Sequence, residues 1–88
     1  MISLKEKSII SRIAGRYRVK RVILFGSSLG KNSHRDIDLA VEGLRAKDFF
    51  KFYGDLLFSL PKPVDLVDLS QDSKFTRLVR EEGLLIYG

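Results

Sequence analysis

Two aspartates separated by a single residue are the feature of this 88-residue chain that most clearly points to chemistry. Asp36 and Asp38 begin the segment DIDLAV, whose other residues are apolar. Residues two apart in an extended strand point to the same face, so both carboxylates would lie opposite Ile37. Two like charges on a strand of an apolar sheet are costly, and a divalent cation is the usual remedy. The pair therefore predicts a metal site.

A later apolar segment, VDLVDL, carries two further acids, Asp65 and Asp68. Carboxylate oxygens suit Mg²⁺, which is typically held by one or two carboxylates together with substrate phosphates. Two such ions can stabilise an in-line nucleotidyl displacement, in which a third carboxylate holds the second ion or accepts a proton. Because Asp65 and Asp68 are three residues apart, they point to opposite faces of a strand. Only one of them can reach the face of the first pair.

The apolar run Val22–Phe25 stops abruptly at Gly26 and Ser27. Small residues at the end of a strand let backbone amides approach a phosphate closely, as in other anion-binding loops. Arg35 could neutralise a phosphate or simply pair with the neighbouring aspartate, and the sequence leaves both interpretations open. Together with the acids, this turn favours metal-assisted chemistry on a nucleoside triphosphate.

The elements that must position these residues follow from periodicity, capping residues and turn residues. We predict helices over 3–17, 46–60 and 73–82, strands over 19–25, 36–41 and 64–69, and a short edge strand over 84–87. Ser3 and Glu6 fit a capping box at the first helix. The two later helices are expected to bury Phe49, Phe50, Tyr53, Leu56, Leu57, Leu60, Phe75, Leu78 and Val79. The predicted fold is α+β, one domain over 1–88, with a small mixed sheet of three to four strands and helices mainly on one face.

Composition narrows the classes of function. The chain has no cysteine, which excludes disulfides, thiolate metal sites and a cysteine nucleophile. Its apolar runs are too short for a membrane span, so a cytoplasmic protein without a membrane partner is expected. The net charge of +5 favours polyanionic partners, but the basic residues are scattered rather than massed. Direct binding of nucleic acid is therefore not expected.

Three motifs, taken in order, resemble the minimal nucleotidyltransferases of the DNA polymerase β-like superfamily. They are the Gly26-Ser27 turn, the Asp36–Val41 strand and the Val64–Leu69 strand. The ending Glu81–Tyr87 is also similar to the family's C-terminal segment, so the resemblance covers nearly the whole chain. Each motif alone occurs by chance, but their order on predicted strands makes a specific signal.

The resemblance implies Mg²⁺-dependent transfer of a nucleoside monophosphate, AMP from ATP or from another NTP, to an acceptor hydroxyl. By position, Gly26 and Ser27 would bind the triphosphate, Asp36 and Asp38 would hold two metal ions, and Asp65 would complete the triad. Members of this family are commonly antitoxins of toxin–antitoxin systems. They bind a HEPN-type ribonuclease toxin and can modify it by adding AMP to a tyrosine.

Two departures from the family pattern leave a second hypothesis open. Many members carry a basic residue soon after Gly-Ser, where this chain has Ser28-Leu29-Gly30 before Lys31. Lys31 or Arg35 would have to supply that charge across a loop shorter than usual. The alternative is a weak or inactive enzyme that neutralises its partner by binding alone. A chain of 88 residues leaves no separate domain for a large acceptor, so a protein partner or self-association must supply acceptor specificity.

Overall fold

The computed structural model describes residues 2–26 and 36–88. The described α-helices and strands follow the order helix, strand, strand, helix, strand, helix, strand, which is the order that the sequence predicts. In order they are α1 (Leu4–Arg16), β1 (Arg21–Leu24), β2 (Ile37–Glu42), the 3₁₀ helix η2 (Ala46–Asp48), α2 (Phe49–Ser59), β3 (Val64–Asp68), α3 (Lys74–Glu82) and β4 (Leu84–Tyr87).

The four strands form one mixed sheet in the order β3-β2-β1-β4. Strand β1 pairs antiparallel with both β2 and β4, whereas β2 and β3 run parallel. A parallel pair needs a crossover connection, and α2 supplies it between these two strands. The α+β class and the mixed sheet predicted from the sequence are confirmed, and β3, which carries two acids, lies beside the strand of the first pair.

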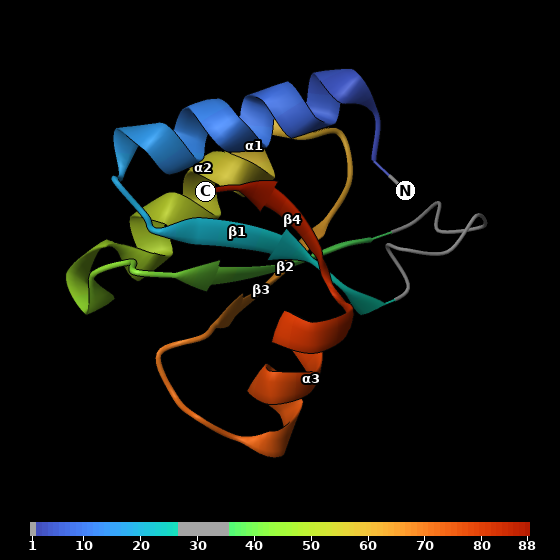
Figure 1. Ribbon diagram of the computed structural model, residues 1–88. Helices are drawn as coiled ribbons and strands as arrows, with labels where there is room; N and C mark the ends of the chain where they lie inside the picture. Colours follow the sequence, from blue (N-terminus) through green and yellow to red (C-terminus); the bar gives the residue numbers. More distant parts are fainter. Residues whose placement is uncertain (1, 27–35) are drawn as a thin grey trace.

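Helices α1 and α2 cover one face of the sheet, and α3 lies against the other (Figure 1). The larger core cluster joins α1 and α2 to the inward residues of β2, including Leu39 and Val41. A second, smaller cluster lies on the α3 side and consists of four buried residues, Ile23, Ala40, Leu69 and Val79. Alternate residues of β2 therefore enter different clusters, as the two-residue period of a strand requires. None of the described helices has the length and apolar character to cross a membrane.

The starts of two helices are fixed by reciprocal hydrogen bonds. At α1 the Ser3 hydroxyl accepts from the Glu6 amide at 3.1 Å, while the Glu6 carboxylate accepts from the Ser3 amide at 2.8 Å. At α3, Ser73 and Thr76 form the same type of capping box. Each box satisfies amides that a helix start leaves without a partner. The first box confirms the cap predicted from the sequence.

The prediction of which side chains face the core was partly wrong in α2 and α3. Phe50 and Leu57 are 82% and 46% exposed, whereas Phe52, which was not among the residues expected to be buried, has no exposed surface. Apolar residues occur on almost every side of α2, so periodicity alone could not identify the face that packs on the sheet. In α3 only Val79 of the three expected residues is buried, and Phe75 and Leu78 are each 49% exposed.

Candidate functional site

Two of the predicted acids lie directly opposite each other on neighbouring strands. Strands β2 and β3 pair in parallel with Asp38 aligned to Asp65 and Ala40 aligned to Val67. Aligned residues of paired strands share a face, and adjacent strands are about 4.8 Å apart. Ala40 and Val67 belong to the cluster beneath α3, so the two carboxylates lie on that face as well. Asp38 is half-buried and Asp65 is exposed, which keeps both acids accessible to a ligand.

Asp36 lies immediately before β2 and is exposed to solvent. The backbone amide of the next residue, Ile37, donates to the Pro63 carbonyl at 2.8 Å, so pairing with the neighbouring segment already begins there. The structure thus places Asp36 two residues from Asp38, at the same end of the sheet, but outside the regular strand.

Asp68 occupies the other face of β3. It aligns with Val41, whose side chain belongs to the larger core cluster under α1 and α2. Its carboxylate accepts a hydrogen bond from the Ser70 amide at 2.9 Å, which stabilises the turn after the strand. The geometry therefore leaves Asp65 as the acid of β3 that adjoins the first pair. The catalytic and metal-binding roles of these aspartates remain predictions.

Gly26 brings the end of β1 against the Asp38 carboxylate. Its φ of +66° lies in the left-handed region that favours glycine. A Cβ at this position would lie only 2.9 Å from Asp38 Oδ2. The preceding amide, that of Phe25, donates to the Asp38 carbonyl at 3.0 Å and ties the two strands together at this point. Gly26, which the sequence predicts to lie in a phosphate-binding turn, is thus next to Asp38, which the sequence predicts to bind a metal ion.

Three other predicted binding residues, Ser27, Lys31 and Arg35, lie outside the described residues. Their assignment to the triphosphate therefore stays a prediction. The described part of the candidate site consists of Gly26 and the acids. It contains the residues that the sequence predicts to bind metal, but only one of those that it predicts to bind the triphosphate.

The described acids fit a magnesium–nucleotide better than they fit a metal ion alone. Within residues 2–26 and 36–88, no three histidine, aspartate or glutamate side chains gather closely enough to hold a metal by themselves. Mg²⁺, however, keeps several waters and usually takes one or two carboxylates, the remaining ligands coming from substrate phosphates. Asp38 and Asp65 supply such a pair on the α3 side of the sheet. The donor set is therefore suited to an ion that arrives with phosphate ligands.

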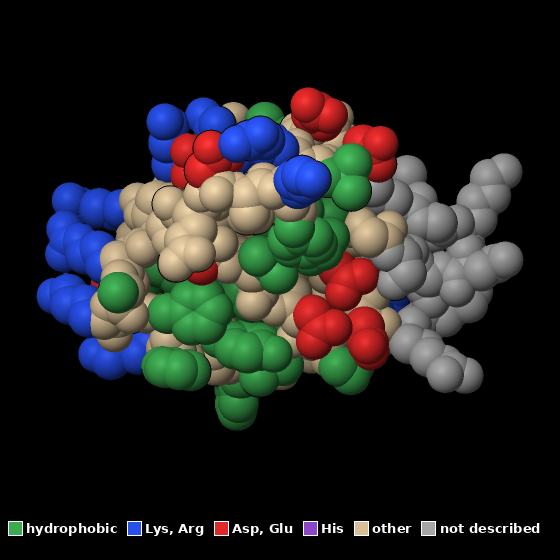
Figure 2. Space-filling model, turned by 90° about the horizontal axis from the view of Figure 1, so that it is seen from below, with side chains coloured by type: hydrophobic (Ala, Val, Ile, Leu, Met, Phe, Trp, Pro, Cys, Tyr) green, Lys and Arg blue, Asp and Glu red, His purple; other side chains and the backbone are tan. Residues whose placement is uncertain are grey.

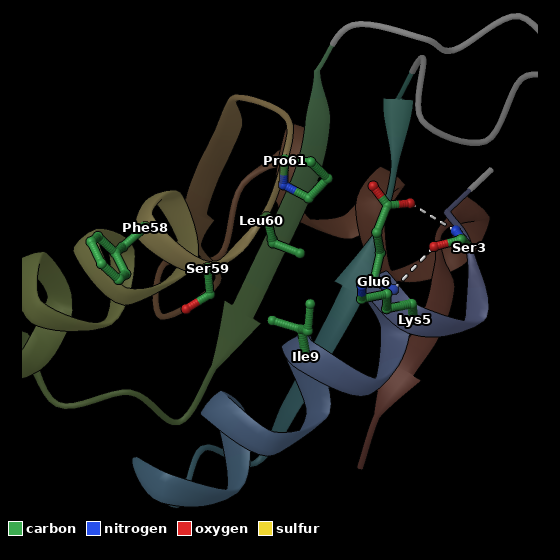
Figure 3. Close-up of a pocket in the computed structure, with 8 residues that line it drawn as sticks. All are labelled: Ser3, Lys5, Glu6, Ile9, Phe58, Ser59, Leu60 and Pro61. Atoms are coloured by element: carbon green, nitrogen blue, oxygen red, sulfur yellow. Dashed lines mark hydrogen bonds between the residues drawn. The ribbon is translucent and has the colours of Figure 1, made fainter.

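One cavity lies away from these acids, between the start of α1 and the end of α2 (Figure 3). Its volume is about 470 Å³, and its lining includes Glu6, Ile9 and Leu60. Burial raises the pKa of Glu6, but hydrogen bonds from Ser3 and the charge of Lys62 outweigh it and hold that pKa below its ordinary value. The Glu6 carboxylate is already engaged by these two neighbours. This cavity lies on the far side of the sheet from Asp38 and Asp65 and takes no part in the candidate site.

A second cavity, of about 270 Å³, adjoins the candidate site on the α3 side and is lined by Phe25, Gly26, Phe75, Leu78, Val79, Glu82 and Gly83. Figure 2 shows this side of the molecule, where hydrophobic and acidic side chains reach the surface close to one another. The sequence interpretation missed this cavity because it assigned Phe75 and Leu78 to the core. Helical spacing shows that two residues share a face, but it does not show whether that face is filled.

The sequence matches the family described as "Polymerase beta, Nucleotidyltransferase" over residues 7–88. A search of curated proteins found no match to the chain. Among solved structures, a toxin–antitoxin complex crystallised with AMP-PNP is 27% identical, with a TM-score of 0.76 over 93% of this chain and 73% of that chain. A mutant toxin–antitoxin complex that carries two aspartate-to-glutamate substitutions is 25% identical, with a TM-score of 0.74 over 97% of this chain and 74% of that chain.

The toxin–antitoxin MntA–HepT is 23% identical and aligns with a TM-score of 0.73 over 98% of this chain and 73% of that chain. At that identity the likeness shows the fold alone. In each of the three pairs the alignment spans nearly all of this chain, so the sheet and the helices that position the candidate site share the architecture of those structures.

Proposed function

Because the chain belongs to the polymerase β nucleotidyltransferase family, we propose that it is an Mg²⁺-dependent nucleotidyltransferase that acts as an antitoxin. The reaction is transfer of AMP from ATP to a hydroxyl group, and the acceptor is a tyrosine of a HEPN-type toxin partner. The single observation that carries the proposal is the opposition of Asp38 and Asp65 beside the left-handed Gly26.

Each described residue of the candidate site would have a part in this reaction. Asp36, Asp38 and Asp65 would hold magnesium, which when bound neutralises phosphate charge and orients the triphosphate. Gly26 lets the backbone at the end of β1 approach the phosphates without a side chain in the way. The acceptor oxygen then forms a bond to the α-phosphorus, the bond to pyrophosphate breaks, and the exposed carboxylate of Asp65 accepts the hydroxyl proton.

Two of the solved relatives support the proposal. One toxin–antitoxin complex was crystallised with AMP-PNP, an adenine nucleotide, which favours ATP as the substrate here. In the other, the two aspartates replaced by glutamate are two positions apart, the spacing of Asp36 and Asp38. Both complexes pair an antitoxin with a toxin protein, which favours a protein as the acceptor.

The decisive experiment compares acids on the two faces of the sheet. We expect calorimetric titration of ATP with Mg²⁺ to show binding to the wild type that is lost in Asp38→Asn and strongly weakened in Asp65→Asn. Asp68→Asn is the matched control, because Asp68 is on β3 but faces away from the site. Circular dichroism would verify the fold of each variant. Equal binding of ATP by the wild type and Asp38→Asn would refute the proposed site.

A second candidate function is neutralisation of the toxin by binding alone. It is favoured by exposed aromatic side chains on α2, where Phe50 and Phe58 are 82% and 93% exposed. Such side chains on a helix surface suit a protein contact. The two functions differ in one result: a binding antitoxin would still protect cells from its toxin after Asp38→Asn, whereas the enzyme would not.

A further inference from the structure

The cavity between the end of β1 and α3 continues directly from the candidate site. Gly26 belongs to both, because it lines the cavity and also abuts the Asp38 carboxylate. A nucleotide has its phosphates at one end and its base at the other, joined by the ribose. A phosphate-binding turn that opens into a second cavity therefore has the layout that a whole nucleotide needs.

The lining of this cavity suits a flat aromatic ring. Phe25 and Phe75 meet edge to face, with ring centroids 5.7 Å apart, and Leu78 lies one turn further along α3. Phe75 and Leu78 are each 49% exposed although they are large apolar residues, because the space in front of them is open. The cavity volume of about 270 Å³ is sufficient for a nucleobase. Aromatic side chains bind bases by stacking, which tolerates any base with a π face.

One acidic group breaks the apolar lining. Glu82, at the last position of α3, contributes to the cavity wall and is exposed to solvent. A carboxylate accepts hydrogen bonds and cannot donate them, so it favours a base edge that carries an amino group over one that carries a carbonyl oxygen. Adenine has such an amino group, and hypoxanthine has a carbonyl in its place.

We propose that this cavity is the base subsite of the nucleotide, with Phe25 and Phe75 contacting the ring and Glu82 selecting an amino-bearing base such as adenine. The inference rests on the proposed function, because it assumes that the phosphates of the same nucleotide lie at Gly26. It gives the exposed part of the Phe75 ring a function in addition to its packing on Phe25.

The test separates the base from the phosphates. Calorimetry with Mg²⁺ would compare ATP with inorganic tripolyphosphate, which has the phosphates and no base. We expect the wild type to bind ATP about tenfold more tightly than tripolyphosphate, the scale of one base–aromatic stacking contact. Phe75→Ala should remove most of that difference while leaving tripolyphosphate affinity unchanged. Phe50→Ala, which removes an exposed phenylalanine of α2 on the other face, is the matched control and should behave as wild type.

A second comparison tests the selection of the base. ITP differs from ATP at the base edge by a carbonyl in place of the amino group, and we expect the wild type to bind it about fivefold more weakly. Glu82→Gln presents an amide that can also donate, so it should narrow the difference between ATP and ITP. Should Phe75→Ala fail to fold, nuclear Overhauser contacts between adenine protons and phenylalanine ring protons in the wild type would decide the question instead.

The possible failures are distinguishable. If ATP and tripolyphosphate bind the wild type equally, the base subsite is refuted while the phosphate site stands. If Phe75→Ala impairs neutralisation of the toxin but leaves ATP binding intact, the cavity holds a side chain of the protein partner and the base proposal is again refuted. If neither ATP nor tripolyphosphate binds the wild type, the proposed function itself fails and the inference fails with it.

Discussion

Substituting Gly26 by alanine tests the contact on which the candidate site depends. The backbone at this position has a φ of +66°, where a residue with a Cβ is strained by roughly 1–2 kcal/mol. The new methyl group would also lie 2.9 Å from Asp38 Oδ2, closer than ordinary contact allows, so the carboxylate must move. We therefore expect Gly26→Ala to lose about 1–2 kcal/mol of unfolding free energy and to displace the Asp38 carboxylate, which we propose to hold magnesium.

Two measurements follow from this expectation. In a domain of this size each kcal/mol corresponds to roughly 4–8 °C, so thermal unfolding of Gly26→Ala should occur about 5–15 °C below the wild type. Calorimetry should show at least about tenfold weaker binding of ATP with Mg²⁺, because a misplacement on the order of 1 Å in such a site costs up to about 100-fold in function.

Gly54→Ala provides the control. Gly54 lies within α2, and a Cβ built there meets nothing within 4 Å. Alanine in an open helical position should stabilise the protein by about 0.5–1 kcal/mol and leave ATP binding unchanged. In an Asp38→Ala background, Gly26→Ala should cost less unfolding free energy than it does in the wild type. The part of the cost that arises from contact with the carboxylate would be absent, whereas the part that arises from the left-handed φ would remain. A Gly26→Ala protein with wild-type stability and wild-type ATP binding would refute the reasoning.

Two further predictions concern the fold. Glu6→Ala should cost about 1–2 kcal/mol in urea unfolding at neutral pH, because it removes one half of a capping box and the ion pair with Lys62. The lowered pKa of Glu6 means that its charged form stabilises the fold above its ordinary pKa and that this contribution is lost as the pH falls through the lowered value, so the difference between variant and wild type should shrink in acid. A difference that grows in acid would contradict this sign. Phe52→Ala should cost about 3–5 kcal/mol, since the side chain is completely buried, whereas Phe50→Ala should change the unfolding free energy by less than about 0.5 kcal/mol. Equal losses would mean that the exposed and buried faces of α2 are wrongly assigned.

Local patterns in the sequence were sufficient to predict most of the fold. Each predicted helix and strand is present with ends that differ by a few residues, because capping serines, prolines and glycines define these ends locally. The two-residue period of a strand also predicted that only one of Asp65 and Asp68 could adjoin the first pair. That period alone does not choose between them, and the family resemblance favoured Asp65. The register of β2 against β3, which depends on packing between segments far apart in the chain, places Asp65 opposite Asp38.

The features that could not be predicted depend on which surfaces meet. Almost every side of α2 is apolar, so the inward position of Phe52 follows from the orientation of the helix on the sheet and not from its sequence. The approach of Gly26 to Asp38 joins two strands across the sheet, and sequence spacing carries no sign of it. The cavity beside Gly26 exists because α3 buries only one side of its apolar face, leaving Phe75 beside open space.

The division of the sheet into two faces explains how so small a domain can combine stability with a charged site. Strand β2 contributes Leu39 and Val41 to the larger core, while Asp38 points to the face that α3 covers only in part. Because Asp38 is only half-buried and Asp65 is exposed, neither carboxylate is fully desolvated, and the fold does not bear the full cost of burying two like charges. Because Asp65 is exposed, neutralising it should leave the unfolding free energy almost unchanged. A loss of ATP binding in Asp65→Asn would then report on the chemistry of the site and not on a failure to fold.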